Sequence, residues 1–128
     1  MKEELIFNTD LHFEHETWSR ELDFWQDELE SFQNRLNELV MRFTDKDMYA
    51  NIEKFQNQLN IHEGVMNSIR NQIQMHESNI ADHYKKDEDS MNREMVKKHL
   101  EIRDRMENQR DIICDMKKNL FSFLTKYL

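Results

Sequence analysis

Hydrophobic side chains recur along most of this chain at alternating intervals of three and four residues. The repeat is unbroken in the middle of the sequence, where its positions are Met48, Ile52, Phe55, Leu59, His62, Met66, Ile69, Ile73, His76, Ile80 and His83. This heptad spacing puts one stripe of side chains along a helix, and such a stripe packs against partner helices. The pattern predicts a long helix over residues 45–84.

Two flanking segments show the same repeat. The first comprises Leu11, His15, Trp18, Leu22, Trp25, Leu29, Phe32, Leu36, Leu39 and Phe43, and the last comprises Met95, His99, Ile102, Met106, Gln109, Ile113, Met116, Leu120, Phe123 and Tyr127. They predict helices over residues 10–43 and 89–127. Thr44 and Asp47, between the first two stripes, form a capping-box pattern for the second helix.

Short connections join helices as antiparallel neighbours, so the sequence predicts an all-α fold. We expect an elongated up-down-up antiparallel three-helix bundle with coiled-coil-like heptad packing, in a single domain over residues 1–128. The composition agrees with this fold, because the chain has no proline, one glycine and 34 % charged residues. Such a composition is typical of long, solvated helices.

The formal net charge of -8 limits the partners of the protein. It repels phosphate, and no basic stripe is visible, so neither nucleic acid nor an anionic membrane surface is an expected partner. No apolar run approaches the roughly 18 residues that span a bilayer, and Glu3 and Glu4 replace the positive charge of a signal peptide. We expect a cytoplasmic protein with one free thiol, at Cys114.

Four large apolar residues lie outside the stripes, namely Phe13, Phe24, Phe121 and Leu128. In a homodimer they could contact a second copy of the chain, which would supply the helix that a four-helix bundle needs. Scattered apolar residues are also common on the surfaces of monomers. The sequence leaves a homodimer and a monomer open.

Five of the six histidines occupy stripe positions, namely His15, His62, His76, His83 and His99. Only two positions of each heptad face the core, and histidine is not among the residues that are most often buried. Pairing the antiparallel helices level by level brings His15, His76 and His99 together, one from each helix. His12 precedes His15 by one turn and lies at the level of Glu77.

Three inward-pointing imidazoles form a tripod that suits zinc, copper, iron or nickel, with His12, Glu77, Glu14 or water completing the shell. The sequence therefore predicts a transition-metal-binding bundle with His15, His76 and His99 as ligands. In the alternative interpretation the protein is a structural or protein-interaction bundle, whose core histidines fix helix register or respond to pH. Three neutral imidazoles cannot satisfy one another without a proton, water or metal, and this favours the metal.

Other polar core positions have simpler interpretations. His62 lies at the level of Gln109 and is expected to hydrogen-bond to it, and His83 is expected at the solvated end of the bundle. Met95, four residues before His99, is a candidate soft ligand.

No catalytic activity or organic cofactor is predicted. The chain lacks the Glu-x-x-His pairs of di-iron bundles and any His-Glu-x-x-His motif, and its single glycine excludes phosphate-binding loops. The sequence therefore favours a protein that is not an enzyme.

Residues 11–18, Leu-His-Phe-Glu-His-Glu-Thr-Trp, continue through Glu21-Leu22-Asp23-Phe24 to Asp27-Glu28-Leu29. Together with Leu120-Phe121-Ser122-Phe123-Leu124, they resemble a family of small bacterial all-helical proteins with a Leu-His-x-Glu-His-x-x-Trp first helix. The resemblance implies an all-helical, single-domain protein and adds no catalytic residue.

Overall fold

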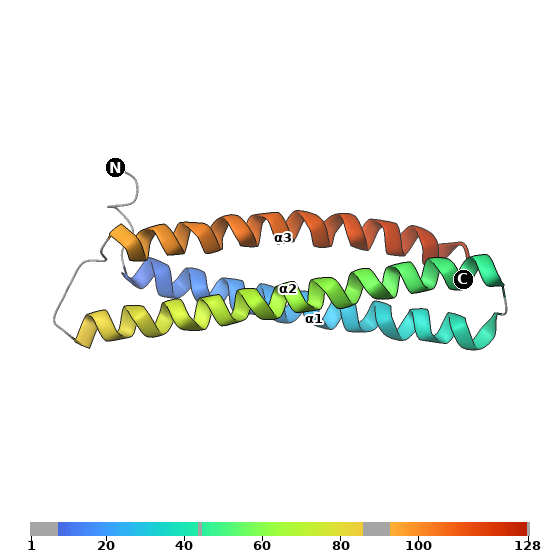
Figure 1. The fold of residues 1–128 in the computed structure, drawn as a ribbon, viewed down its shortest axis with the longest axis horizontal. Coiled ribbons are helices and arrows are strands. Elements are labelled where there is room, and N and C mark those ends of the chain that lie inside the picture. The colour runs from blue at the N-terminus through green and yellow to red at the C-terminus, as the bar shows by residue number, and fades with distance from the viewer. Residues whose placement is uncertain (1–7, 44, 86–92, 128) are drawn as a thin grey trace.

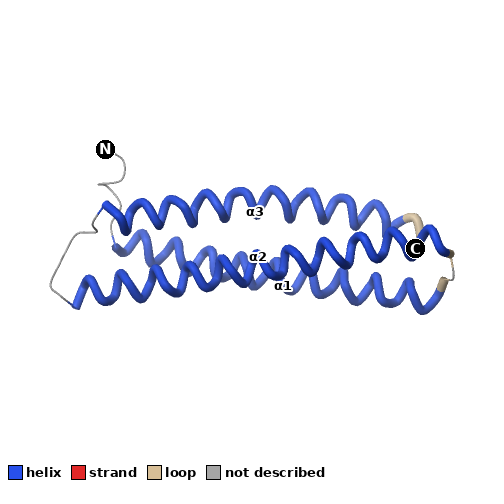
Figure 2. Tube along the Cα trace, viewed as in Figure 1, coloured by secondary structure: helices blue, strands red, loops and turns tan. Residues whose placement is uncertain are grey.

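Three long helices lie side by side in an elongated bundle (Figure 1). The computed structural model describes residues 8–43, 45–85 and 93–127. Helix α1 spans Asn8–Arg42, α2 spans Lys46–Lys85 and α3 spans Arg93–Thr125. Helix α2 runs antiparallel to the other two, and the described residues contain no strand (Figure 2). The predicted up-down-up three-helix bundle is confirmed.

The helix boundaries agree with the predicted ones to within two residues wherever the structure describes them. Helix α1 begins two residues early, at Asn8, and α3 ends at Thr125 rather than at residue 127. The predicted start of the third helix at residue 89, and Thr44 of the capping box, lie outside the described residues. Asp45 caps α2, because its Oδ1 atom accepts a 2.9 Å hydrogen bond from the backbone amide of Asp47.

The stripe positions form the core, as the heptad pattern predicts. The main apolar cluster contains Trp18, Leu22, Trp25, Leu29, Leu36, Leu39, Met48, Ile52, Leu59, Met66, Ile69, Ile73, Ile102, Met106, Ile113, Met116, Leu120, Phe123 and Leu124. Four stripe aromatics, Phe32, Phe43, Phe55 and Tyr127, are only partly buried or exposed. Val96 and Leu124 are buried although each lies one position after the stripe, because three converging helices also cover the positions that flank it.

A second, smaller apolar cluster contains Leu11, Ile80 and Met95. Each of these residues lies one helical turn from a buried histidine of the same helix. The cluster sits at the end of the bundle where α1 and α3 begin and α2 ends (Figure 1). A polar layer therefore interrupts the apolar core near this end.

Three ion pairs join the parallel helices α1 and α3 at intervals of one heptad. Glu14 pairs with Arg103, Glu21 with Arg110 and Glu28 with Lys117, and the partners of each pair are 89 residues apart in the sequence. This constant separation holds α1 and α3 in one register.

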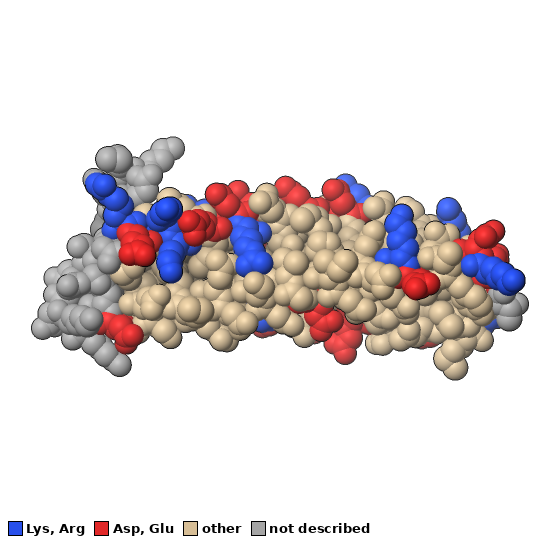
Figure 3. Space-filling view, in the orientation of Figure 1, with Lys and Arg blue, Asp and Glu red and all other residues tan. Residues whose placement is uncertain are grey.

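The surface carries both signs of charge. On the face in Figure 3, acidic and basic side chains are intermingled along the bundle. Phe13, Phe24 and Phe121 are exposed, while Leu128 lies outside the described residues, so a homodimer stays a prediction. Among the described helices, none has an apolar stretch long enough to cross a membrane.

Candidate metal centre

His15, His76 and His99 come from three different helices and meet in one layer of the core. Their side chains are 3 %, 2 % and 0 % exposed. The ring centroids form a nearly equilateral triangle, with sides of 5.1 Å between His15 and His99, 5.2 Å between His15 and His76, and 5.4 Å between His76 and His99. One candidate ligand nitrogen from each ring lies within 4.8 Å of the others. The predicted convergence of these three histidines is confirmed.

Each helix presents its histidine because the residue replaces an apolar member of the stripe. His15 follows Leu11 by four residues and precedes Trp18 by three, so it shares their face of α1. The Trp18 ring stacks on His99 with 4.9 Å between centroids. The layer is therefore enclosed by Trp18 on one side and by the Leu11 cluster on the other.

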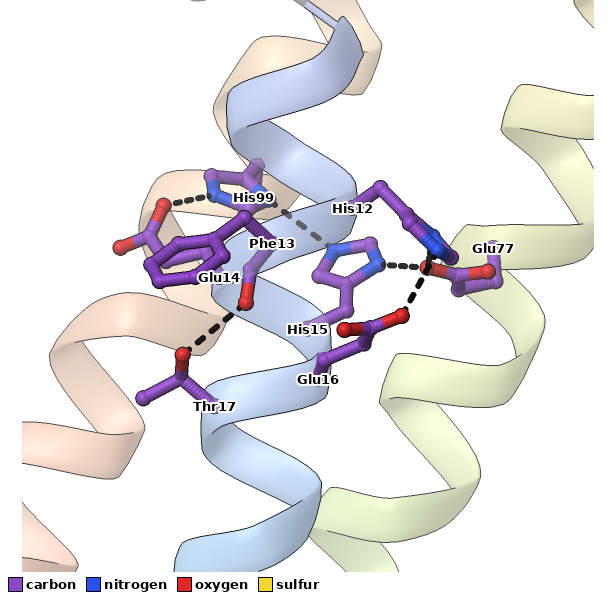
Figure 4. Close-up of polar contacts among 8 residues, drawn as sticks. All are labelled: His12, Phe13, Glu14, His15, Glu16, Thr17, Glu77 and His99. Atoms are coloured by element: carbon purple, nitrogen blue, oxygen red, sulfur yellow. Dashed lines mark hydrogen bonds and ion pairs between the residues drawn. The ribbon is translucent and has the colours of Figure 1, made fainter.

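Two carboxylates hold two of the rings in fixed orientations (Figure 4). Glu77 Oε1 lies 2.6 Å from His15 Nδ1, and Glu14 Oε1 lies 2.7 Å from His99 Nε2. Arg103 donates two hydrogen bonds of 2.8 Å to the oxygens of Glu14. Glu14 is therefore clamped between an imidazole and a guanidinium group.

Both carboxylates are ionised at neutral pH. Burial acts to raise the pKa of Glu14, but hydrogen bonds from Arg103 and His99 outweigh it, so the pKa lies below its ordinary value. Burial likewise acts to raise the pKa of Glu77, and the contacts with His15 and His12 bring it below the ordinary value. Ionised carboxylates can only accept hydrogen bonds.

The ionised carboxylates determine which ring nitrogen of His15 and of His99 carries a hydrogen. Nδ1 of His15 and Nε2 of His99 must each carry a hydrogen in order to donate to their carboxylates. In a neutral imidazole the other nitrogen then has a free lone pair. The two remaining nitrogens, His15 Nε2 and His99 Nδ1, lie 3.2 Å apart. When both rings are neutral, two acceptors thus face each other, and a metal cation or a proton between them would satisfy both.

Unlike His15 and His99, His76 is not held by a carboxylate of the described residues. Among the described residues, neither of its ring nitrogens has a hydrogen-bond partner, and both are buried. Burial, followed by the proximity of His15 and His99, lowers the pKa of His76 to about 4. Burial is also the main cause that lowers the pKa of His99, against the opposing effect of Glu14. His76 is therefore neutral at pH 7 and offers unused lone-pair capacity to the centre of the layer.

The other two predicted site residues lie at the edge of the layer. His12 is exposed, and its Nδ1 atom is 3.3 Å from the same Glu77 oxygen that contacts His15. Its Nε2 atom is 3.0 Å from Glu16. Beside them, an open groove of about 530 Å³ runs between α1 and α2, and Arg20 and Gln74 also line it. We call this the α1–α2 groove.

Sequence reasoning gave Glu14 only as one alternative ligand and missed Arg103. A signal for both exists in the heptad spacing of Glu14, Glu21 and Glu28 on α1, which matches that of Arg103, Arg110 and Lys117 on α3. Complementary charges at equal heptad spacing indicate a ladder of ion pairs between parallel helices.

The remaining polar stripe residues do not join the layer. His62 is partly buried and lies 3.4 Å from Gln109 through its Nδ1 atom, which confirms the predicted pair. Burial lowers the pKa of His62. Met95 packs in the Leu11 cluster, and its role as a soft ligand stays a prediction. The side chain of His83 is outside the described part of the chain.

Comparisons of the chain with models of protein families, with curated proteins and with solved structures give no match. The resemblance of residues 11–18 to a family of bacterial helical proteins therefore stays a prediction.

Proposed function

We propose that this protein binds a transition-metal ion between His15, His76 and His99. One observation carries the proposal: His15 Nε2 and His99 Nδ1 face each other at 3.2 Å while their other nitrogens contact carboxylates. A shared metal ion satisfies both lone pairs. It also gives a partner to His76, which has none among the described residues.

The distances suit coordination. Two nitrogens that are 2.0–2.1 Å from a tetrahedral zinc ion lie roughly 3.3–3.4 Å apart, close to the 3.2 Å between His15 Nε2 and His99 Nδ1. One nitrogen of His76 lies within 4.8 Å of a nitrogen of each of the other two histidines, so the three rings together can supply a three-nitrogen set. Imidazole nitrogens favour zinc, copper, iron and nickel over magnesium and calcium.

The carboxylates support this role. In metal sites, a ligating histidine commonly donates its other N–H to a carboxylate, which fixes the tautomer and makes the ligand more basic. Glu77 stands in this relation to His15, and Glu14 to His99. Arg103 neutralises Glu14, so Glu77 leaves about one negative charge near the cation, which reduces the cost of burying it.

Metal analysis of protein purified without an affinity tag tests the proposal. We expect close to one equivalent of a first-row transition metal per chain, or the same stoichiometry when zinc or cobalt is added back after chelation. Cobalt should give the intense visible absorption of a tetrahedral nitrogen-ligated ion. The replacement His62→Gln serves as a control and should keep full binding, because His62 lies outside the layer.

A chain that holds no transition metal, and whose melting temperature does not respond to added zinc, copper or cobalt, would refute the proposal. The layer would then be a polar register device of the bundle, with an extra proton in place of the metal between His15 and His99.

A further inference from the structure

At the histidine layer each pair of helices meets along a line that we call a seam, and the three seams differ in charge. Arg103 lies at the α1–α3 seam, where it holds Glu14 against His99. Lys98 of α3 is near enough to His76 of α2 for its positive charge to lower the pKa of that histidine. The α1–α2 seam instead carries the carboxylates of Glu16 and Glu77 beside His12. A cation that approaches the layer meets Arg103 beside Glu14 at the α1–α3 seam, whereas at the α1–α2 seam it meets two carboxylates and the single cation Arg20 beside Glu16.

Apolar residues close the layer along the bundle axis. The cluster of Leu11, Ile80 and Met95 covers it toward the bundle end, and Trp18 stacks on His99 from the other side. A hydrated ion cannot pass the Leu11 cluster or Trp18 without opening the core. The α1–α2 groove, in contrast, reaches His15 directly from solvent.

Glu77 connects this groove with the buried layer. Its Oε1 atom is 3.3 Å from Nδ1 of the exposed His12 and 2.6 Å from Nδ1 of the buried His15. Glu77 is 40 % exposed and His12 is 62 % exposed, whereas His15 is 3 % exposed. One carboxylate oxygen therefore lies between a solvent-accessible imidazole and an enclosed one (Figure 4).

We propose that a divalent transition-metal ion reaches the centre through the α1–α2 groove, where His12, Glu16 and Glu77 attract it before it moves inward to Nε2 of His15. This inference rests on the proposed metal centre and adds a transient outer site to it. Imidazole and carboxylate are suitable ligands for such an ion. The ion moves inward when the hydrogen bond between Glu77 and His15 opens, and His76 and His99 then complete its shell.

The rates of metal binding and release test the route. Metal-free protein is mixed with cobalt in a stopped-flow instrument, and tryptophan fluorescence reports binding, because Trp18, one of the two tryptophans of the chain, stacks on His99. Release is followed by mixing the loaded protein with excess chelator. In the double variant His12→Gln/Glu16→Gln, the association rate constant should fall by at least about tenfold, the lower end of the gain that electrostatic focusing in a cleft gives to association. The release rate constant should fall as well, because the ion leaves by the same path. The dissociation constant should change less than either rate constant, because His15, His76 and His99 stay in place.

Two further variants distinguish the route from a general effect of charge. Glu53→Gln removes one exposed carboxylate of α2 far from the groove and should leave both rates unchanged. Arg20→Gln removes the cation that lies 3.6 Å from Glu16, so it should speed binding.

Several results would overturn the route. The α1–α2 groove would be excluded as the path if the double variant bound and released cobalt at the rates of the parent protein. It would also be excluded if Glu53→Gln slowed both rates as much as the double variant does. A weaker dissociation constant with an unchanged association rate would make His12 and Glu16 permanent ligands. A parent protein that binds no cobalt would instead refute the metal centre itself, and this is seen before any rate is compared.

Discussion

At the scale of single residues, His76 has the least favourable surroundings among the residues that the structure describes. Its two ring nitrogens are buried, and no described residue satisfies them. A buried polar group without a partner costs about 1–3 kcal/mol of stability. A buried polar residue without a partner is best explained by a ligand that binds it. The unsatisfied nitrogens of His76 therefore support the metal centre more strongly than the position of His76 in the stripe does.

The replacement His76→Leu should therefore stabilise the metal-free protein. Leucine fills a similar volume without polar atoms, so we expect the free energy of unfolding to rise by about 1–3 kcal/mol. The same variant should lose its thermal response to zinc. Calorimetry with chelator and with zinc measures both effects. A destabilised variant would show that His76 has a polar partner in solution.

His62→Leu is the matched control, because it removes a histidine of the same helix outside the layer. It should cost about 1–3 kcal/mol, since it leaves the buried Gln109 without its partner. The thermal response to zinc should persist.

The pH dependence of stability follows from the lowered pKa values in the layer. The pKa of His76 is about 4 in the fold, against an ordinary value of 6.5. Above pH 6.5 the ring is neutral in both the folded and unfolded states. Below it the unfolded chain binds a proton that the fold excludes, so each such group lowers the free energy of unfolding by about 1.4 kcal/mol per pH unit. His99, whose pKa is also lowered, acts in the same direction.

We therefore expect the metal-free protein to lose stability as the pH falls from 6.5 toward 4. Glu14 and Glu77 add a further loss below their ordinary pKa of 4.5, because their folded pKa values are lowered. Denaturant unfolding in the presence of chelator measures the profile. His76→Leu should flatten the loss between pH 6.5 and 5, and an unchanged slope in this variant would contradict the assignment.

At the scale of helices, the heptad stripes were sufficient to predict the number, order and core faces of the elements. They also predicted the meeting of His15, His76 and His99, because adjacent antiparallel helices joined by short connections have little freedom of register. The stripes could not predict which flanking residues touch across α1 and α3. Those helices are not consecutive, and their relative register depends on both connections together. Arg103 was missed for this reason.

The α1–α3 ladder offers a test of how Arg103 acts on the site. Replacing Arg103 with alanine removes the two hydrogen bonds that hold Glu14 against His99. Loss of a group that is hydrogen-bonded to a ligand typically weakens metal binding about 10–100-fold, and Arg103 acts on His99 only through Glu14, so we expect a loss of about tenfold, at the low end of that range. A competition assay with a chelator of known affinity measures the change.

Arg110→Ala is the control within the same ladder. Arg110 pairs with Glu21 through two similar hydrogen bonds, one heptad farther along α1 and α3. Both variants should lose a similar, small amount of stability, but only Arg103→Ala should lose metal affinity. Equal affinity losses would mean that the ladder acts through helix register rather than through Glu14.

At the scale of the whole molecule, the histidine layer divides the bundle into unequal parts. Among the described residues, the apolar cluster beyond it contains Leu11, Ile80 and Met95, whereas the main core occupies the rest of the bundle. In the metal-free protein, a layer with unsatisfied polar groups separates the small cluster from the main core. Segments with few buried apolar contacts open locally more often than the core does. The end of the bundle that carries the layer should therefore open first.

A metal ion held by one ligand from each helix would tie this end together. Ligand binding stabilises the folded state by about 2.7 kcal/mol when the free ligand is a hundredfold above its dissociation constant. Because all three ligands lie near the starts of α1 and α3 and the end of α2, the gain should be local. Hydrogen exchange with and without zinc should show strong slowing of the amides in residues 11–18, 73–80 and 95–102. Amides around Leu36 and Ile52, at the other end of the bundle, should change little. Uniform slowing would mean that the bundle opens as one unit, and no slowing in the three segments would mean that zinc binds elsewhere.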